Sequence, residues 1–492
     1  MIVLTCPVQP LSRIERTRMD ITDGIASMAA DIRSGALTPT TITEALLARV
    51  AALDPGLHAF VQIMRDEALA QAQAAEAQLR GGRDLGPLHG IPYAAKDLFD
   101  VLGVATGAGC RLLSDNIAER DSAVVGNLAK AGSVLLGKTH TVQFAYGAAG
   151  INHDLGTPHN PWHREPHAPG GSSSGSAVAV AAGLVPMALG TDTGGSVRVP
   201  AALCGIVGLK TTIGRISRAG VYPLSPTLDS VGPITRTVED AALAFQAMQG
   251  HDGRDASTRG VTPLDTLRGL RDGVHGLRIA FCETTFFDDV DADVGLAVRD
   301  AAHVFRALGS PVGAMAIPEV AAAWAEPKRP LLIPAEACAV NGTLLDHHLA
   351  ALDPVIGPRM LTGRSLSAPD YFALLARLTD LQRDICWTLR DVDAFIVPTT
   401  MSPARPIAEF DADLDRYLAY NWRVHRNTGL GNLLNLCAVS VPCGFSADGL
   451  PIGLQIYAKP FQEDVALRVA YAYEQATQWH RARPNMEWLA LR

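Results

Sequence analysis

The sequence predicts an α/β fold: one large domain in which a β-sheet is covered by helices. From residue 86 onward, short apolar runs alternate with segments of helical pattern, which is typical of a sheet with helices on its faces. The chain has 492 residues, 48% of them hydrophobic, enough for a large core. Length alone suggests about three domains of roughly 150 residues. However, the polar, glycine-rich stretch 250–276 is typical of a surface connection between two halves of one fold, with a domain boundary there as the alternative.

The N-terminal part is expected to be helical. Residues 20–80 contain Thr38 followed by Pro39, the favoured order of cap and first residue at a helix start. A second helix, DEALAQAQAAEAQLR, is expected to end at Gly81. Helical patterning begins just after Met19, so we expect residues 1–18 to be a disordered tail or an upstream start.

Buried strands are predicted where apolar runs are short and continuous. These are GIPYAAKD, SVLLGKTH, MALGTD, LRIAFC, DAFIVPTT, NLCAVSVPCGF and LPIGLQIYAKP. EDVALRVAYAYEQATQWH is expected to be a closing amphipathic helix.

Composition argues against several classes of partner. The net charge of -8 lacks the basic excess of a nucleic-acid surface. No window offers the ~20 apolar residues of a membrane span. Eight scattered cysteines, none in a C-x-x-C pair, indicate a reduced, cytoplasmic protein without a disulfide framework. We therefore expect no nucleic-acid and no membrane partner.

The stretch APGGSSSGSAVAVAAG places several hydroxyls at the start of an apolar segment. Residues 176–185 predict a buried helix, whose N-terminal N–H groups point toward the serines. A helix of about ten residues travels roughly 15 Å. The following strand of about six residues returns roughly 20 Å. This path would bring Ser196 close to Ser172, and the turn at Gly194–Gly195 can present backbone N–H groups as an oxyanion hole does.

A base for these serines must come from elsewhere in the chain. No histidine lies between Ser172 and Ser196, and a buried lysine can act instead when its pKa is depressed. Lys96, Lys138 and Lys210 all end apolar runs, and spacing does not choose among them.

Simpler and rival interpretations of the loop also exist. Serines and glycines are common in a flexible loop with a helix cap. A phosphate-binding loop would need a following lysine. The match of Gly171–Gly175 to G-x-S-x-G lacks the strand that must precede a nucleophile elbow.

The motif GGSSSGSAVAVAAGLVPMALGTDTGGSVRVPAALCGIVGLKTT resembles the defining stretch of the amidase signature family. The likeness includes GIPYAAKDLFDV, KAGSVLLGKTH, TPHNPW, SPTLDSVGPITRTVEDAAL and AVSVPCGFSADGLPIGLQI. It implies a single domain with a mixed twisted sheet covered by helices on both faces. The expected division is a tail (1–18) and an amidase domain (19–492), made of N-terminal helices (19–82), the signature core (86–240), a variable substrate-shaping region (250–385) and the C-terminal part of the core (386–492).

The resemblance also implies site residues, position by position. The implied catalytic residues are Lys96 as base, Ser172 as bridging serine and Ser196 as nucleophile, with a cis peptide entering Ser172. The implied oxyanion donors are the backbone N–H groups of Thr193, Gly194 and Gly195, with Asp192 and Arg198 as supports or an ordinary ion pair. The chemistry is acyl transfer to Ser196, with no cofactor and no metal.

Several positions depart from the family's usual pattern. Ser174 replaces a glycine and could face the substrate. Gln143 and Tyr146 could line the pocket or pack beneath it, and a structural role is expected for His140. Packing or surface roles are expected for Trp324, His347, His348 and Trp422 in poorly matching stretches.

These features lead us to expect a free-standing amidase acting on a small-molecule carboxamide, with a homodimer as the candidate assembly and the oligomeric state left open. The alternative within the family is the glutamine-hydrolysing A subunit of a tRNA-dependent amidotransferase. A distant alternative is an inactive binding module, disfavoured because all three triad positions are filled.

Overall fold

A computed structural model describes residues 24–491 of the chain, so the predicted tail 1–18 lies outside the described residues. The strands are β1 (Phe60–Ile63), β2 (Pro92–Lys96), β3 (Val134–Thr139), β4 (Met187–Asp192), β5 (Val207–Lys210), β6 (Ser230–Thr235), β7 (Ile279–Phe281), β8 (Val312–Ala314), β9 (Ala394–Pro398), β10 (Cys437–Phe445) and β11 (Pro451–Ala458). The seven strands predicted from apolar runs are all present, whereas β1, β5, β6 and β8 were not predicted.

The principal helices flank this sheet. They are α1 (Ile25–Ser34), α2 (Pro39–Leu57), α3 (Arg65–Arg80), α4 (Ala123–Lys130), α5 (Ser174–Ala181), α6 (Arg198–Cys204), α7 (Val238–Met248), α8 (Ala292–Ala307), α9 (Pro318–Ala325), α10 (Leu332–Val340), α11 (Gly342–His347), α12 (Ile356–Leu361), α13 (Ala368–Thr388), α14 (Ile407–Phe410), α15 (Leu414–Leu433) and α16 (Glu463–Ala476).

All the strands join one sheet in the order β1-β3-β2-β4-β6-β5-β10-β11-β9-β7-β8. The sheet is mixed: β2 runs parallel to β3 and β4, whereas β6, β10 and β11 pair antiparallel with their neighbours. The predicted α/β fold with a mixed sheet and helices is confirmed. Because β4 and β11 belong to the same sheet, the polar stretch 250–276 connects parts of one fold; the finer domain boundaries stay a prediction.

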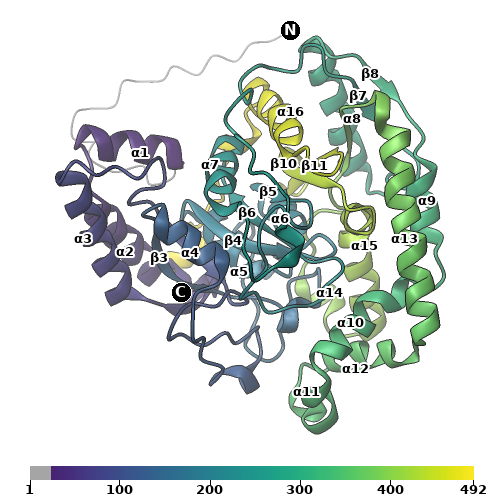
Figure 1. Ribbon diagram of the computed structural model, residues 1–492, viewed down its shortest axis with the longest axis horizontal. Coiled ribbons are helices and arrows are strands. Elements are labelled where there is room, and N and C mark those ends of the chain that lie inside the picture. The colour runs from purple at the N-terminus through teal and green to yellow at the C-terminus, as the bar shows by residue number, and fades with distance from the viewer. Residues whose placement is uncertain (1–23, 492) are drawn as a thin grey trace.

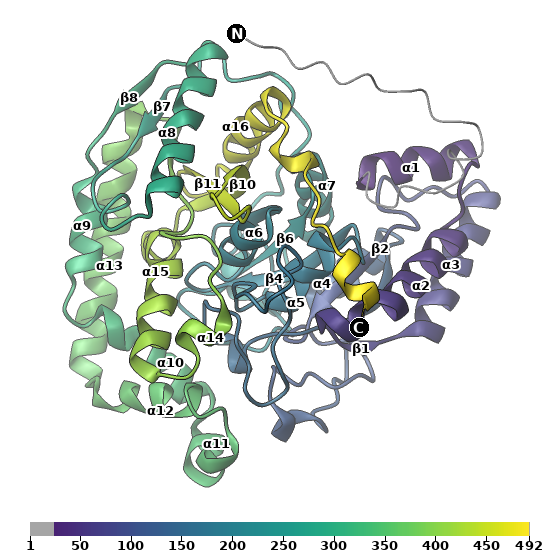
Figure 2. The same cartoon turned by 180° about the vertical axis from the view of Figure 1, so that it is seen from behind.

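Figures 1 and 2 show the arrangement: α1–α3 lie at one side of the molecule, α9–α13 at the other, and the core with β4–β6 and α5–α7 between them. The predicted cap is confirmed, since Thr38 Oγ1 accepts from Thr41 N–H at 3.2 Å. The helix after the serine loop begins at Ser174 and ends at Ala181, earlier at both ends than predicted. Among residues 24–491, no helix combines the length and apolar character needed to cross a bilayer.

Candidate active site

Lys96 ends β2, an interior strand that is third from one edge of the sheet and lies directly beside β4. Its Nζ donates hydrogen bonds to Ser172 Oγ at 2.7 Å and to Thr191 Oγ1 at 2.8 Å. Burial lowers the pKa of Lys96 to about 7, and the negative charges of Asp229 and Asp192 limit the drop. The lysine is therefore held next to a serine with a large neutral fraction near pH 7.

The other two candidate lysines have different partners. Lys138 Nζ lies 2.8 Å from Asp97 Oδ1 in a buried ion pair. Lys210 Nζ donates to the carbonyl oxygens of Leu436 and Thr211. Of these three lysines, only Lys96 contacts a serine of the loop.

The serine loop and the GGS turn lie side by side, as the lengths of the helix and strand predict. The Ser173 N–H donates to the Ser196 carbonyl at 3.2 Å, although 23 positions separate them. The peptide bond between Gly171 and Ser172 is cis, as the resemblance implies. Ser172 is fully buried, and Ser196 is nearly so while lining a cavity.

Asp192 and Arg198 form a fully buried ion pair beneath the GGS turn. Arg198 Nη2 lies 2.9 Å from Asp192 Oδ1 and also donates to Asn432 Oδ1, while Nη1 donates to Gln455 Oε1. Although burial by itself raises the pKa of Asp192, Arg198 outweighs it and holds the pKa at about 2. The pair is therefore charged at neutral pH, and it orients the turn from below.

The Asp192 carboxylate shapes the turn through its backbone. Oδ1 accepts from Gly195 N–H at 2.8 Å and Oδ2 from Val197 N–H at 3.2 Å. The Gly195 N–H is thus bonded to this carboxylate in the structure, and its part in an oxyanion hole stays a prediction. Thr193 and Gly194 line the cavity beside Ser196. In the described part of the chain, no hydrogen bond uses the N–H groups of Thr193 and Gly194.

The cavity in front of Ser196 has a volume of about 320 Å³. Two arginines enter it from the region between α9 and α13. Arg359 lies 4.3 Å from the ring centre of Tyr146, and Arg329 lies 3.7 Å from that of Trp324. Neither arginine takes part in an ion pair with any residue of the described chain. The polar and aromatic lining comprises Tyr146, Thr193, Ser196, Arg329, Arg359, Asn421, Trp422 and His425.

The positions of four side chains bear on the expected pocket. Tyr146 lines the cavity, and so does Trp422, for which a packing or surface role was expected. Gln143 is fully buried and is not part of the lining, since it donates to Asp154 and accepts from Asp353 N–H. Ser174 is also buried, at the first turn of α5, and its Oγ has no hydrogen-bond partner within the described chain. Gln143 and Ser174 therefore do not face a substrate.

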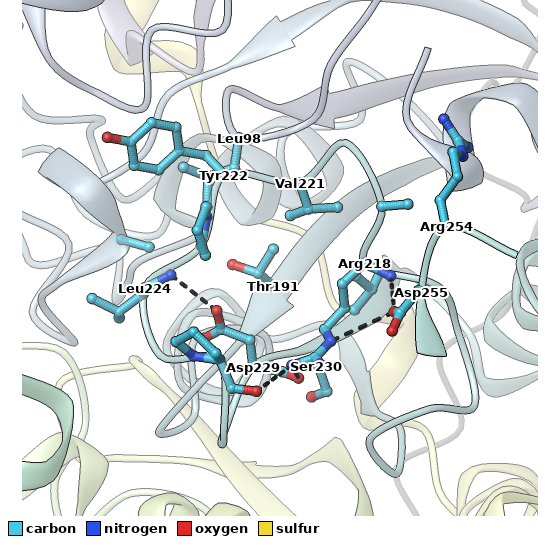
Figure 3. Close-up of a pocket in the computed structure, with 15 residues that line it drawn as sticks. Leu98, Thr191, Arg218, Val221, Tyr222, Leu224, Asp229, Ser230, Arg254 and Asp255 are labelled. Carbon is cyan, nitrogen blue, oxygen red and sulfur yellow. Dashed lines mark hydrogen bonds and ion pairs between the residues drawn. The ribbon is translucent and has the colours of Figure 1, made fainter. Parts of the chain in front are cut away.

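A second cavity of about 280 Å³, called the rear cavity below, lies next to Thr191 and Asp229. Figure 3 shows Thr191, Tyr222 and Asp229 on its wall, with Leu224 N–H bonded to the Asp229 carboxylate. Asp229 Oδ1 also accepts from Thr193 Oγ1 at 2.5 Å. Ala145 and Leu224 line both cavities, so the two adjoin; Thr191, which contacts Lys96, lines the second, and Thr193 lines the first.

Sequence reasoning missed Thr191 and Asp229, although both lie in quoted motifs, GTDTGGS and SPTLDSVG. A polar residue at the end of an apolar strand could have signalled each of them. It also missed Arg329, Arg359 and His425, which lie in the poorly matching regions and carry no local motif.

The chain is similar to known proteins along most of its length. The family model described as Amidase matches residues 41–467. The A subunit of the glutamyl-tRNA(Gln) amidotransferase of Geobacter metallireducens is 37% identical over 475 residues, which cover 92% of this chain and 96% of that protein. The same subunit of Roseiflexus sp. is 39% identical over 476 residues, with the same coverage.

Solved structures of a peptide amidase and of an amidotransferase A subunit are both similar to this chain. Native peptide amidase of Stenotrophomonas maltophilia has a TM-score of 0.82 at 32% identity, covering 94% of this chain and 99% of that one. The A subunit of the glutamyl-tRNA(Gln) amidotransferase of Thermotoga maritima has a TM-score of 0.76 at 31% identity, covering 93% and 95%.

These similarities correct two expectations. A free-standing small-molecule amidase was expected, but the full-length relatives at 37% identity and above are amidotransferase subunits. The expectation that a small-molecule amide is the sole partner, with no nucleic acid, is contradicted by the same finding, because the names of these relatives include a tRNA. The negative charge used to exclude nucleic acid describes one chain, and one subunit of a complex can leave tRNA binding to its partners.

Proposed function

Because the chain belongs to the amidase signature family and is a hydrolase of carbon–nitrogen amide bonds, we propose that it hydrolyses the side-chain amide of glutamine as the A subunit of a tRNA-dependent amidotransferase. The full-length similarity to such subunits carries this proposal. It is supported by the contact between Lys96 and Ser172 beside the Ser196 cavity. The division into domains given above is part of the same proposal, as is a cytoplasmic location.

The proposed reaction is acyl transfer through Ser196. Neutral Lys96 takes the proton of Ser172 Oγ, which takes that of Ser196 Oγ, and Ser196 Oγ attacks the amide carbon. The N–H groups of Thr193 and Gly194 stabilise the oxyanion. The relay then protonates the leaving nitrogen, the C–N bond breaks and ammonia departs. Water attacks the acyl-enzyme and releases glutamate.

The front cavity offers partners for the two charged groups on the α-carbon of glutamine. Arg329 and Arg359 have no carboxylate partner within the described chain, so either can bind the α-carboxylate of the substrate. Burial lowers the pKa of His425 to about 4, so its ring is neutral at pH 7. Its Nδ1 lies 2.6 Å from the Asn421 carbonyl and donates to it, which leaves Nε2 as an acceptor for the α-ammonium.

The rear cavity suits a transfer enzyme. Ammonia that reaches an acceptor without loss needs a way out that differs from the substrate entrance. Thr191, next to Lys96, lines the rear cavity, whereas Ser196 lines the front one. We therefore assign the front cavity to glutamine and the rear one to the departing ammonia.

The test is ammonia release from glutamine, with the full chain alone and with the partner subunits, ATP and misacylated tRNA. Ser196→Ala is expected to abolish release in both settings. Ser174→Ala, in the same loop, is the matched control and should retain activity because its hydroxyl has no partner. Failure to hydrolyse glutamine both alone and with the partner subunits, ATP and misacylated tRNA would overturn the proposed substrate. An active Ser196→Ala variant would overturn the assignment of the nucleophile.

A further inference from the structure

A turn just before the serine loop carries two histidines and a glutamate. His163, Glu165 and His167 each offer a ligand atom, and these atoms all lie within 4.8 Å of one another. The two imidazole rings are in contact, with centroids 4.1 Å apart. His167 is buried, His163 is partly exposed and Glu165 is exposed, so the cluster has one fixed wall and an open entrance. Two imidazoles and a carboxylate are a donor set that binds zinc in proteins.

The backbone of Glu165 orients both rings. Its carbonyl oxygen lies 2.9 Å from His167 Nδ1 and 3.4 Å from His163 Nδ1, and its two lone pairs can accept from both. With Nδ1–H on this carbonyl, each ring keeps an unprotonated Nε2. Metal-bound histidines commonly have this kind of support. The Glu165 N–H also lies 3.1 Å from His163 Nδ1, so that ring has a second tautomer, and metal binding would select the first.

The donor atoms of this cluster are not engaged elsewhere. Within the described residues, Glu165 takes part in no ion pair, and no hydrogen bond uses its carboxylate or the Nε2 atoms of the two histidines. His153 is a useful contrast, because Asp353 and Asp411 hold both of its ring nitrogens, at 2.9 and 2.8 Å. His153 is thus committed to a carboxylate pair, whereas the 163–167 cluster is available to a cation.

We propose that His163, Glu165 and His167 form a Zn²⁺ site, with water as the fourth ligand. Zinc–nitrogen distances of about 2.0–2.1 Å in a tetrahedral site place ligand atoms about 3.3 Å apart. The ring nitrogens and carboxylate oxygen that lie within 4.8 Å of one another need to close by at most about 1.5 Å, which the exposed Glu165 on its bend can supply. The site differs from the expectation of no metal, and it takes no part in amide cleavage.

The effect of zinc would be structural. His167 lies five positions before Ser172, and its neighbours pair with the segment before α14. Ala168 N–H donates to the Arg405 carbonyl, and Ile407 N–H donates to the Pro166 carbonyl, both at 2.9 Å. A metal that joins His163 to His167 would stiffen the chain that leads into the serine loop. We expect zinc to raise Tm while kcat stays unchanged.

The experiment is a zinc titration of the full chain, purified without a histidine tag and stripped of metal. Isothermal calorimetry should find one Zn²⁺ per chain and no Mg²⁺, which prefers oxygen ligands. His163→Ala and Glu165→Gln each alter an accessible side chain and should weaken zinc binding by about 10-fold or more. Tm should rise with zinc in the parent chain and not in His163→Ala.

The matched control is His347→Ala, which removes one ring of another adjacent histidine pair, with centroids 6.5 Å apart. It should bind zinc as the parent chain does. Zinc affinity that His163→Ala leaves intact, or that His347→Ala lowers equally, would refute the site. Zinc binding that is lost in Ser196→Ala would instead locate the metal in the amidase centre and also refute it. None of these outcomes depends on whether glutamine is the substrate.

Discussion

The protonation state of Lys96 is expected to set the pH dependence of hydrolysis. With a pKa of about 7, Lys96 is about one-tenth neutral at pH 6, half neutral at pH 7 and nine-tenths neutral at pH 8. Only the neutral amine can accept a proton, so activity rises with pH. We expect kcat/KM to fall about fivefold from pH 7 to pH 6 and to rise about twofold from pH 7 to pH 8.

The perturbation that tests this reasoning is Asp229→Asn. The negative charge of Asp229 favours protonated Lys96, so its removal should lower the Lys96 pKa further. An opposite charge nearby is worth about one pKa unit or more, and the rising limb should move to lower pH by about that amount. Asp229 also accepts from Thr193 Oγ1, so the maximal rate can fall as well. The measured quantity is therefore the pH at the midpoint of the rise in kcat/KM, and not the maximal value that kcat/KM reaches.

The assay is ammonia release from glutamine between about pH 5.5 and pH 9, with kcat/KM fitted at each pH. Asp255→Asn is the control, because Asp255 lines the same cavity and pairs with Arg218 but does not perturb Lys96. Lys96→Arg cannot lose its proton and should be at least about 100-fold slower at every pH. A flat profile between pH 6 and 8 would refute the argument. A limb that moves upward in Asp229→Asn, or moves equally in Asp255→Asn, would do the same.

Three further predictions concern charged side chains: the buried Arg198, the partly buried Arg359 and the more exposed His153. Arg198→Met should lower the free energy of unfolding by about 3–5 kcal/mol, because it leaves Asp192 as an unpaired buried charge; adding Asp192→Asn should recover part of this loss in denaturant titrations, and no recovery would contradict the reasoning. Arg359→Met should raise KM for glutamine about 10-fold or more with a smaller effect on kcat; initial rates check this, and an unchanged KM would assign the carboxylate elsewhere. A hydrogen bond to Asp353 raises the pKa of His153 to about 9. The parent chain should therefore be more stable than His153→Gln by its full margin below about pH 6.5, and this margin should be lost as pH rises through 9. Thermal melts that show the opposite trend would exclude this pairing.

Local signals in the sequence explain why much of the fold was predicted. Thr38 caps a helix through a bond to a residue three positions away, so its role can be recognised without tertiary contacts. Continuous apolar runs such as AFIVP are strands because both faces are covered in the sheet centre. The short edge strand β8 was missed, since only Val312 of its three residues is buried and no apolar pattern marks it.

The sequence by itself determined the chemistry at the level of a motif. GGSSSGS contains Ser172, and GTDTGGS contains Ser196 at a glycine turn. The helix and strand between them have lengths that bring Ser196 back near Ser172. The sequence also determined seven of the eleven strands in the described sheet, and it placed Lys96, Lys138 and Lys210 at the ends of apolar runs. These properties follow from residue type, local order and period, which act over a few residues.

Only the tertiary structure explains why Lys96, and not Lys138 or Lys210, meets the serines: Lys96 and Ser172 are 76 positions apart and are joined by the packing of β2 beside β4. It also turned Gln143 inward, engaged the Gly195 N–H with Asp192 and brought Arg359 over Tyr146. Each of these outcomes depends on distances and on burial between distant segments. Such through-space quantities set hydrogen bonds and pKa values, and no local pattern encodes them.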